Sequence, residues 1–110
     1  EIRSISGVEM IILKPTILGG IEKTLQFMTQ AENAAIDTVI SSSFESSLGI
    51  WALTNIVETS THNTAAGLDT LKWFETDVLK KPLQIQKGMI DINTQSVPPE
   101  NINFDQLTAI

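Results

Sequence analysis

Apolar residues along this chain occur in short runs separated by polar segments that contain glycine or proline. Residues 8–13 are almost all apolar, which is typical of a strand buried on both faces in a parallel sheet. Lys14-Pro15 ends that run, since proline cannot donate to a strand ladder. After Gly19-Gly20 the apolar spacing becomes that of a helix over residues 21–33, with three residues on one face: Ile21, Leu25 and Met28.

A second strand and helix follow. Residues 38–40 predict a strand that ends in three serines at 41–43, and residues 46–59 predict a helix that is apolar around much of its circumference. Ser42 and Glu45 have the S-x-x-E spacing of a capping box, in which each side chain bonds the other residue's backbone N–H. We therefore expect a buried helix that is capped by this pair.

The last third of the chain carries weaker patterns. Residues 65–68 predict a short third strand, and residues 83–92 predict a hairpin. A short helix is expected from Asp105. Asp69 or Thr70 can cap a helix between these segments, whose apolar face would be Leu71, Phe74 and Val78.

This order of elements predicts parallel strands joined by helical crossovers. A complete (β/α)₈ barrel takes roughly 250 residues, whereas this chain has 110. The chain is therefore either a small open sheet or a slice of something larger. It begins at Glu1 without a methionine, which favours a fragment.

Composition and charge exclude several classes of protein. With 42% hydrophobic and 18% charged residues the chain is typical of a globular domain, and its apolar runs are far shorter than a membrane span of roughly 20 residues. The net charge of −6, without a basic cluster, disfavours nucleic acid and anionic membranes as partners. Cysteine is absent and no secretion leader is visible, so we expect a cytoplasmic protein without disulfides.

Lys14 is the most informative candidate for chemistry. A lysine at the carboxyl end of a buried parallel strand stands where barrels and open sheets build their sites, and a desolvated lysine there can act as a base or as a focused positive charge. The alternative is a strand-end lysine that extends to solvent over its apolar stem. The local pattern alone leaves both alternatives open.

The serines at 41–43 offer a second candidate. Backbone N–H groups at a strand-to-helix junction can bind a carboxylate or phosphate, although helix capping and tight packing also explain small hydroxyl residues. Gly67, followed by Leu68-Asp69-Thr70, permits close approach of the backbone to a ligand. His62 lies in a polar stretch and is interpreted as a loop residue rather than a catalytic base, because no second histidine or cluster of carboxylates lies near it in the sequence.

Complete catalytic signatures are absent from the sequence. The carboxylates are scattered singly, so no pattern supplies the three oxygen ligands that magnesium would need, and no metal ligand is assigned. Phosphate-binding loops, nucleophile elbows and zinc motifs are also lacking.

Three blocks taken together resemble the o-succinylbenzoate synthase family of the enolase superfamily. They are LKPT at 13–16, SSSFESSLG at 41–49 and GLDT at 67–70, and their order and spacing match over residues 8–80. The serine-rich block separates this family from the dipeptide epimerases and N-acylamino acid racemases, which are less similar there. Residues 83–110 carry no motif of the family.

The resemblance implies an α/β fold in which this chain forms the C-terminal βα units of a (β/α)₇β barrel that carries a capping domain. It implies a lyase of menaquinone biosynthesis that uses Mg²⁺ for the syn-dehydration of 2-succinyl-6-hydroxy-2,4-cyclohexadiene-1-carboxylate to o-succinylbenzoate. Proton abstraction beside a carboxylate forms an enediolate dianion, which such sites stabilise with positive charge.

The resemblance also implies roles for four residues. Lys14 matches the second catalytic lysine, opposite a K-x-K base, where its charge stabilises the enolate or lies against the substrate ring as a cation–π contact. Ser41, Ser42 and the backbone of Gly67 would lie near the carboxylate and succinyl groups of the substrate. The K-x-K base and the acidic Mg²⁺ ligands belong to strands that this sequence lacks.

Three further expectations follow. The 110-residue chain alone should be inactive. Residues 1–82 should form the barrel portion, with residues 83–110 as a hairpin and tail that pack on the barrel or capping domain. The exposed edge of the strand at residues 8–13 should promote self-association. The alternatives to the synthase are an N-acylamino acid racemase, a dipeptide epimerase, or a non-catalytic α/β module that binds a small carboxylate.

Overall fold

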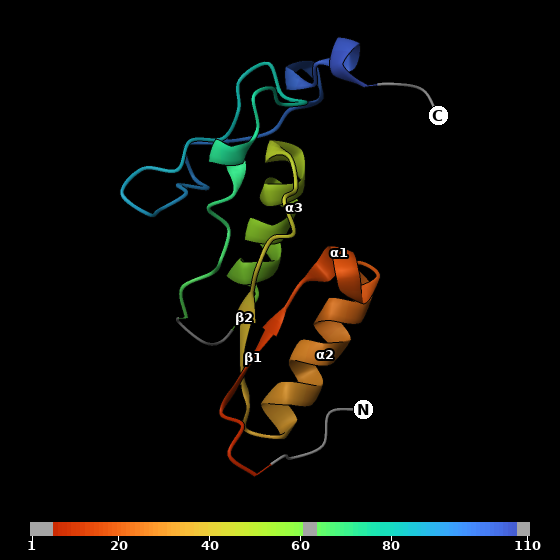
Figure 1. The fold of residues 1–110 in the computed structure, drawn as a ribbon, viewed down its shortest axis with the longest axis vertical. Coiled ribbons are helices and arrows are strands. Elements are labelled where there is room, and N and C mark those ends of the chain that lie inside the picture. The colour runs from red at the N-terminus through yellow and green to blue at the C-terminus, as the bar shows by residue number, and fades with distance from the viewer. Residues whose placement is uncertain (1–5, 61–63, 108–110) are drawn as a thin grey trace.

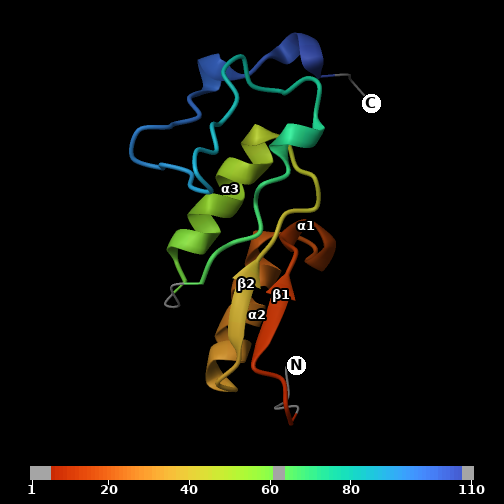
Figure 2. The ribbon, with the colours of Figure 1, turned by 60° about the vertical axis from the view of Figure 1, so that its left-hand side comes forward.

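The computed structural model describes residues 6–60 and 64–107. Two strands, β1 (Met10–Leu13) and β2 (Asp37–Ile40), pair in parallel with Met10 opposite Asp37 and Leu13 opposite Ile40. Helix α2 (Ile21–Asn33) connects them and lies alongside both strands (Figures 1 and 2). The parallel pair and its helical crossover agree with the expected α/β class, and no closed barrel is formed by the described residues.

A short helix, α1 (Pro15–Leu18), was not expected from the sequence. Pro15 stands at its first turn, where the missing N–H costs nothing, and Gly19 ends it with φ 99°. The proline that was interpreted only as the end of a strand therefore also begins a helix. This helix directs the chain away from the sheet immediately after Lys14.

Helix α3 (Ser47–Glu58) follows β2, and its apolar side chains form the centre of the core. Ile50 is fully buried there, and residues from both strands and from the tail pack around it. The buried cluster is Leu13, Ile40, Ile50, Leu53, Ile56, Leu68 and Leu83. The core thus joins the strand ends, α3 and the start of the tail into one packed unit.

The expected apolar face of α2 is wrong in detail. Ile21 and Leu25 are 51% and 39% exposed, whereas Thr24 and Ala31 are fully buried. Met28, the third residue of the expected face, packs against the core as expected, and Phe27 packs there as well. The buried face of α2 is therefore displaced by about one residue from the predicted face. As a result, Ile21 and Leu25 remain partly exposed.

The elements after α3 are less regular than predicted. The expected third strand is a single parallel bridge between Ser41 and Gly67. The expected helix after Thr70 is wrong, because only a 3₁₀ turn (Leu71–Trp73) forms before Phe74 becomes extended. In Figure 1 the chain from this point lies in the upper part of the picture, beside the end at which α3 begins.

The described part of the tail contains a tight turn at Lys87-Gly88, a further turn at residues 92–94 and two short 3₁₀ helices. The predicted hairpin at 83–92 is reduced to a bridge between Gln86 and Met89, with Lys87 and Gly88 both at positive φ as a two-residue hairpin turn requires. The 3₁₀ helices are Pro99–Asn101 and Phe104–Gln106. His62 lies outside the described residues. In the described part of the chain, no helix has the length and apolarity that crossing a bilayer requires.

Candidate active site

The candidate residues gather where the parallel strands end. Lys14 directly follows β1, and Ser41 and Ser42 directly follow β2, whose last pair is Leu13 with Ile40. Gly67 lies beside Ser41 on the other side of β2. Carboxyl ends of parallel strands share one edge of a sheet, so the topology alone places these residues together.

The side chain of Lys14 turns across this edge towards the serines. Its Nζ lies 2.5 Å from the Ser42 carbonyl oxygen and 3.2 Å from the Ser41 Oγ. The side chain is half-buried rather than extended into solvent. The ammonium is therefore held in a defined position by two neutral oxygen acceptors.

Ser41 has a hydroxyl that can be turned towards a ligand. Besides Lys14, its Oγ has only long contacts, at 3.4 Å to each of the carbonyl oxygens of Ser42 and Gly67. Bonds of this length are weak, and the residue is half-buried. Of the three serines, Ser41 is the one that combines nearness to Lys14 with a loosely held hydroxyl.

Ser42 is bound into the structure more firmly. It is 3% exposed, its Oγ donates to the Gly67 carbonyl oxygen at 3.2 Å, and the Oγ lies 3.0 Å from the Thr70 Oγ1. The sequence suggests only a helix cap at Thr70, yet from the turn that follows the Gly67 bridge its hydroxyl also secures the serine segment. Substrate contact through the Ser42 hydroxyl would require exchanging these bonds.

The backbone of Gly67 is likewise engaged. Its N–H donates to the Ile40 carbonyl oxygen at 2.9 Å, and its carbonyl oxygen accepts from the Ser42 N–H at 3.0 Å. A Cβ added at Gly67 would lie 3.0 Å from the Ser41 Oγ. Glycine here keeps the space in front of Ser41 open rather than offering a free N–H to a ligand.

The expected capping box is wrong. The N-cap of α3 is Ser46 rather than Ser42, and no side chain caps it in the expected way. Glu45 instead uses one carboxylate oxygen to accept from the Thr16 hydroxyl and the other to accept from the Ser43 N–H at 2.5 Å. The S-x-x-E spacing predicts a contact within one turn of the chain, whereas Glu45 accepts a hydrogen bond from a residue 29 positions upstream.

The candidate anion site at the start of α3, one of the two alternatives that the sequence left open, is occupied by the chain itself. The Ser47 N–H donates to the Asp77 Oδ2 at 2.9 Å. An internal carboxylate thus already uses the donor and the positive helix end that could have bound a ligand. The positive charge at this edge of the sheet is carried by Lys14 instead.

The magnesium that the resemblance implies would need a group of acidic side chains able to act as ligands. Across residues 6–60 and 64–107, no three His, Cys, Asp or Glu side chains come together in a way that could hold a metal ion. The carboxylate nearest in sequence to the serines, Glu45, already accepts two hydrogen bonds. The described part of this chain therefore does not by itself fit Mg²⁺.

A cavity of about 320 Å³ lies away from the strand ends, between α3 and the turn at 85–92. Its walls are mostly aliphatic, including Val57, Leu68 and Ile90. It contains neither Lys14 nor the serines. This cavity and the groups that could carry chemistry are therefore separate features, and the candidate site is the one at the strand ends.

Comparison with known proteins gives one family repeatedly. The chain is 36% identical over 92 residues to an o-succinylbenzoate synthase of Pasteurella multocida, 43% identical over 74 residues to that of Edwardsiella ictaluri, and 34% identical over 87 residues to that of Haemophilus influenzae. These alignments cover 84%, 67% and 79% of this chain. No protein-family model matches the chain.

The same alignments cover only a part of each relative. They include 27%, 23% and 26% of the three synthases, so the chain spans about a quarter of the length of the curated relatives that it matches. By sequence, the chain belongs to the o-succinylbenzoate synthase family.

Proposed function

We propose that this chain supplies one side of the active site of an o-succinylbenzoate synthase. The reaction would be the Mg²⁺-dependent syn-dehydration of 2-succinyl-6-hydroxy-2,4-cyclohexadiene-1-carboxylate, a small carboxylate substrate of menaquinone biosynthesis. The observation that carries the proposal is the position of the Lys14 ammonium, 3.2 Å from the Ser41 Oγ at the carboxyl ends of two adjacent parallel strands. The names of the similar proteins support the same reaction.

Lys14 has the charge that this reaction needs. Removing a proton beside a carboxylate concentrates negative charge on the substrate, and a fixed positive charge stabilises that state more than the ground state. An ammonium has three donors, and the bonds to Ser41 and Ser42 use two of them. Because both acceptors are neutral, they hold the ammonium in place without cancelling its charge.

Ser41 would contact the substrate directly. Its hydroxyl lies beside the ammonium and can donate to a carboxylate oxygen that the ammonium attracts. Ser42 and Gly67 would act mainly through the backbone, since the Ser42 carbonyl oxygen orients Lys14 and Gly67 leaves space before Ser41. The substrate carboxylate would then meet Lys14 and Ser41 together.

The remaining parts of the site would come from elsewhere in the full-length protein. We expect the K-x-K base and the Mg²⁺ ligands on other strands of a (β/α)₇β barrel, in which residues 1–82 form C-terminal βα units and residues 83–110 pack as a tail. Ile21 and Leu25, which are apolar and exposed on α2, support a neighbouring element in such a barrel. The 110-residue chain alone would then be inactive.

The test is turnover by the full-length protein that contains this chain. We expect conversion of the cyclohexadiene carboxylate to o-succinylbenzoate, and a loss of about 10²–10³-fold in kcat for Lys14→Ala, the range found when one donor to transition-state charge is removed. Lys87→Ala, at an exposed turn, is the matched control. Retained activity in Lys14→Ala would refute its role, and racemisation of N-acylamino acids without dehydration would refute the reaction.

A further inference from the structure

Glu45 joins the two turns that carry the candidate site. Thr16 lies two residues after Lys14, and Ser43 directly follows Ser42. One oxygen of the Glu45 carboxylate accepts from the Thr16 hydroxyl, and the other accepts from the Ser43 N–H at 2.5 Å. The carboxylate thus links the segment after β1 to the segment after β2, at the level where Lys14 crosses between them.

The backbone is built to bring Glu45 into this position. Phe44 has φ 65°, an uncommon conformation for a residue other than glycine, and its side chain is 62% exposed. The positive φ of Phe44 is therefore not explained by packing of the Phe44 side chain. It turns the chain so that Glu45 folds back over the serine segment.

Gly49 provides the space that this conformation needs. A Cβ added there would lie 2.5 Å from the Glu45 Cβ and 3.0 Å from its Cγ. Alanine would otherwise be favoured over glycine inside a helix by about 0.5–1 kcal/mol. The glycine of the SSSFESSLG block is thus explained by the path of the Glu45 side chain, rather than by helix formation.

We propose that Glu45 is a positioning residue that fixes Lys14 against Ser41 and Ser42, a role that goes beyond the function proposed above and rests on it for its catalytic consequence. The link through Glu45 runs beside the link formed by Lys14 itself, so the two turns are held together at two points. Without Glu45, the side-chain hydrogen bonds described between the turn after β1 and the serine segment are those of Lys14 itself, and the ammonium has more freedom to leave the serines.

The bonding pattern separates positioning from proton transfer. A glutamine at position 45 can accept from the Ser43 N–H with its carbonyl oxygen and donate to the Thr16 oxygen with its amide. Glu45→Gln therefore preserves both links but removes the ability to accept and release a proton. Glu45→Ala removes both links, and Thr16→Val removes one of them.

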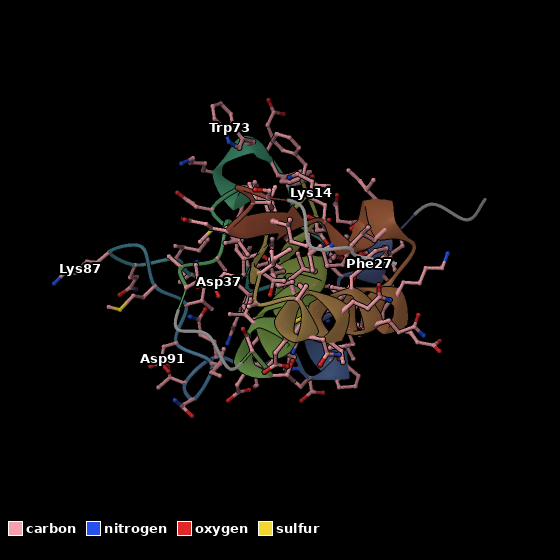
Figure 3. The ribbon with its side chains drawn as sticks, turned by 90° about the horizontal axis from the view of Figure 1, so that it is seen from below. Lys14, Phe27, Asp37, Trp73, Lys87 and Asp91 are labelled. Carbon is pink, nitrogen blue, oxygen red and sulfur yellow. The ribbon has the colours of Figure 1, made fainter. Side chains whose placement is uncertain are left out.

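The first measurement does not depend on catalysis. In the full-length protein, trace acetylation of lysines followed by mass spectrometry compares the labelling rate of Lys14 with that of Lys87, which lies at a distant exposed turn (Figure 3). We expect Glu45→Ala to raise the Lys14:Lys87 ratio about two- to tenfold, the factor expected if the loss of both links weakens the hold on the Lys14 ammonium by the equivalent of one ordinary hydrogen bond. Glu45→Gln should keep the wild-type ratio.

The second measurement is turnover by the same variants. Glu45→Ala should lower kcat about 10–100-fold, as found when a residue that orients an active-site group is removed, while Glu45→Gln stays within a few-fold of wild type. An unchanged labelling ratio in Glu45→Ala, or a Glu45→Gln variant as impaired as Glu45→Ala, would overturn the proposal. A wild-type protein without dehydratase activity would refute the proposed function, and the labelling ratio would still decide whether Glu45 positions Lys14.

Discussion

Asp77 caps helix α3 from a segment 30 residues further along the chain: its Oδ2 accepts from the Ser47 N–H at 2.9 Å. Its Oδ1 accepts from the Leu79 N–H at 2.9 Å, so the same carboxylate also shapes its own turn. Ser47 in return accepts from the Leu83 N–H through its Oγ at 3.1 Å. The start of the tail is thereby fixed to the beginning of the helix that supports the serines.

Asp77→Ala should lower the free energy of unfolding by about 1 kcal/mol, the usual effect of removing a side chain that caps a helix N-terminus. Asp105→Ala, which changes the same residue type at an exposed position of the tail, is the matched control and should have little effect. Urea denaturation of the three proteins measures the difference. Equal midpoints for Asp77→Ala and wild type would show that the cap contributes nothing.

Ser41 and Ser42 should respond differently to alanine substitution. Ser42→Ala removes two part-buried hydrogen bonds, to the Gly67 carbonyl oxygen and to the Thr70 hydroxyl, each worth about 0.5–1.5 kcal/mol, so stability should fall by about 1–3 kcal/mol. Ser41→Ala removes only long contacts and one bond from Lys14, so stability should change by less than about 0.5 kcal/mol.

The kinetic effects should show the opposite order. Ser41→Ala should raise KM of the full-length enzyme, because the hydroxyl is placed to donate to the substrate carboxylate. Ser42→Ala should leave KM nearly unchanged in the fraction of protein that remains folded. Thermal melting and steady-state kinetics on both variants check this, and a KM effect confined to Ser42→Ala would reverse the assignment of the two serines.

Most of the regular elements could be predicted from the sequence because their signals are local. The bounds of α2 and α3 agree with the helical apolar spacing to within about one residue, and β1 and β2 agree with the short apolar runs. The meeting of Lys14 with the serines follows from the order of elements, since both segments end adjacent parallel strands. Local periodicity and topology together were sufficient for this edge of the sheet.

The features that were missed depend on contacts distant in sequence. Glu45 has the spacing of a capping box, but its partner Thr16 belongs to the preceding βα unit. The helix expected after Thr70 does not form over residues 74–78, where Asp77 bonds to α3 instead of continuing a helix. By contrast, α1 has local signals that were overlooked, since Pro15 marks a helix start and Gly19 a helix end.

Asp91 should titrate below its ordinary pKa. The Thr94 hydroxyl donates to its carboxylate at 2.8 Å, and the Asn93 N–H donates at 3.0 Å, so hydrogen bonds to the charged form lower the pKa of Asp91 from the usual 3.8. Because the folded pKa is the lower one, the stabilisation is present above pH 3.8 and is lost as the pH falls through the folded value. Thr94→Val should move the pKa back up, as measured by carboxyl NMR, whereas an unchanged pKa would exclude the hydroxyl as the main cause.

The 110-residue chain studied by itself should self-associate through the open edge of β1. The bonds from β1 towards β2 use the carbonyl oxygens of Glu9 and Leu13, so in a parallel ladder the backbone groups of Met10 and Ile12 face the opposite edge. Within the described part of the chain that edge has no partner strand, and the side chain of Ile12 is 65% exposed beside it. An apolar unpaired edge of this kind favours pairing with a second copy.

Ile12→Lys should reduce this association, because a charge beside an open edge opposes strand pairing. Ile17→Lys adds the same charge at a residue that is 73% exposed on α1, away from the strand edge, and should leave association unchanged. Size-exclusion chromatography with light scattering over a range of concentrations measures all three chains. A wild-type chain that stays monomeric throughout, or an equal effect of the two lysines, would show that β1 is not the surface through which copies meet.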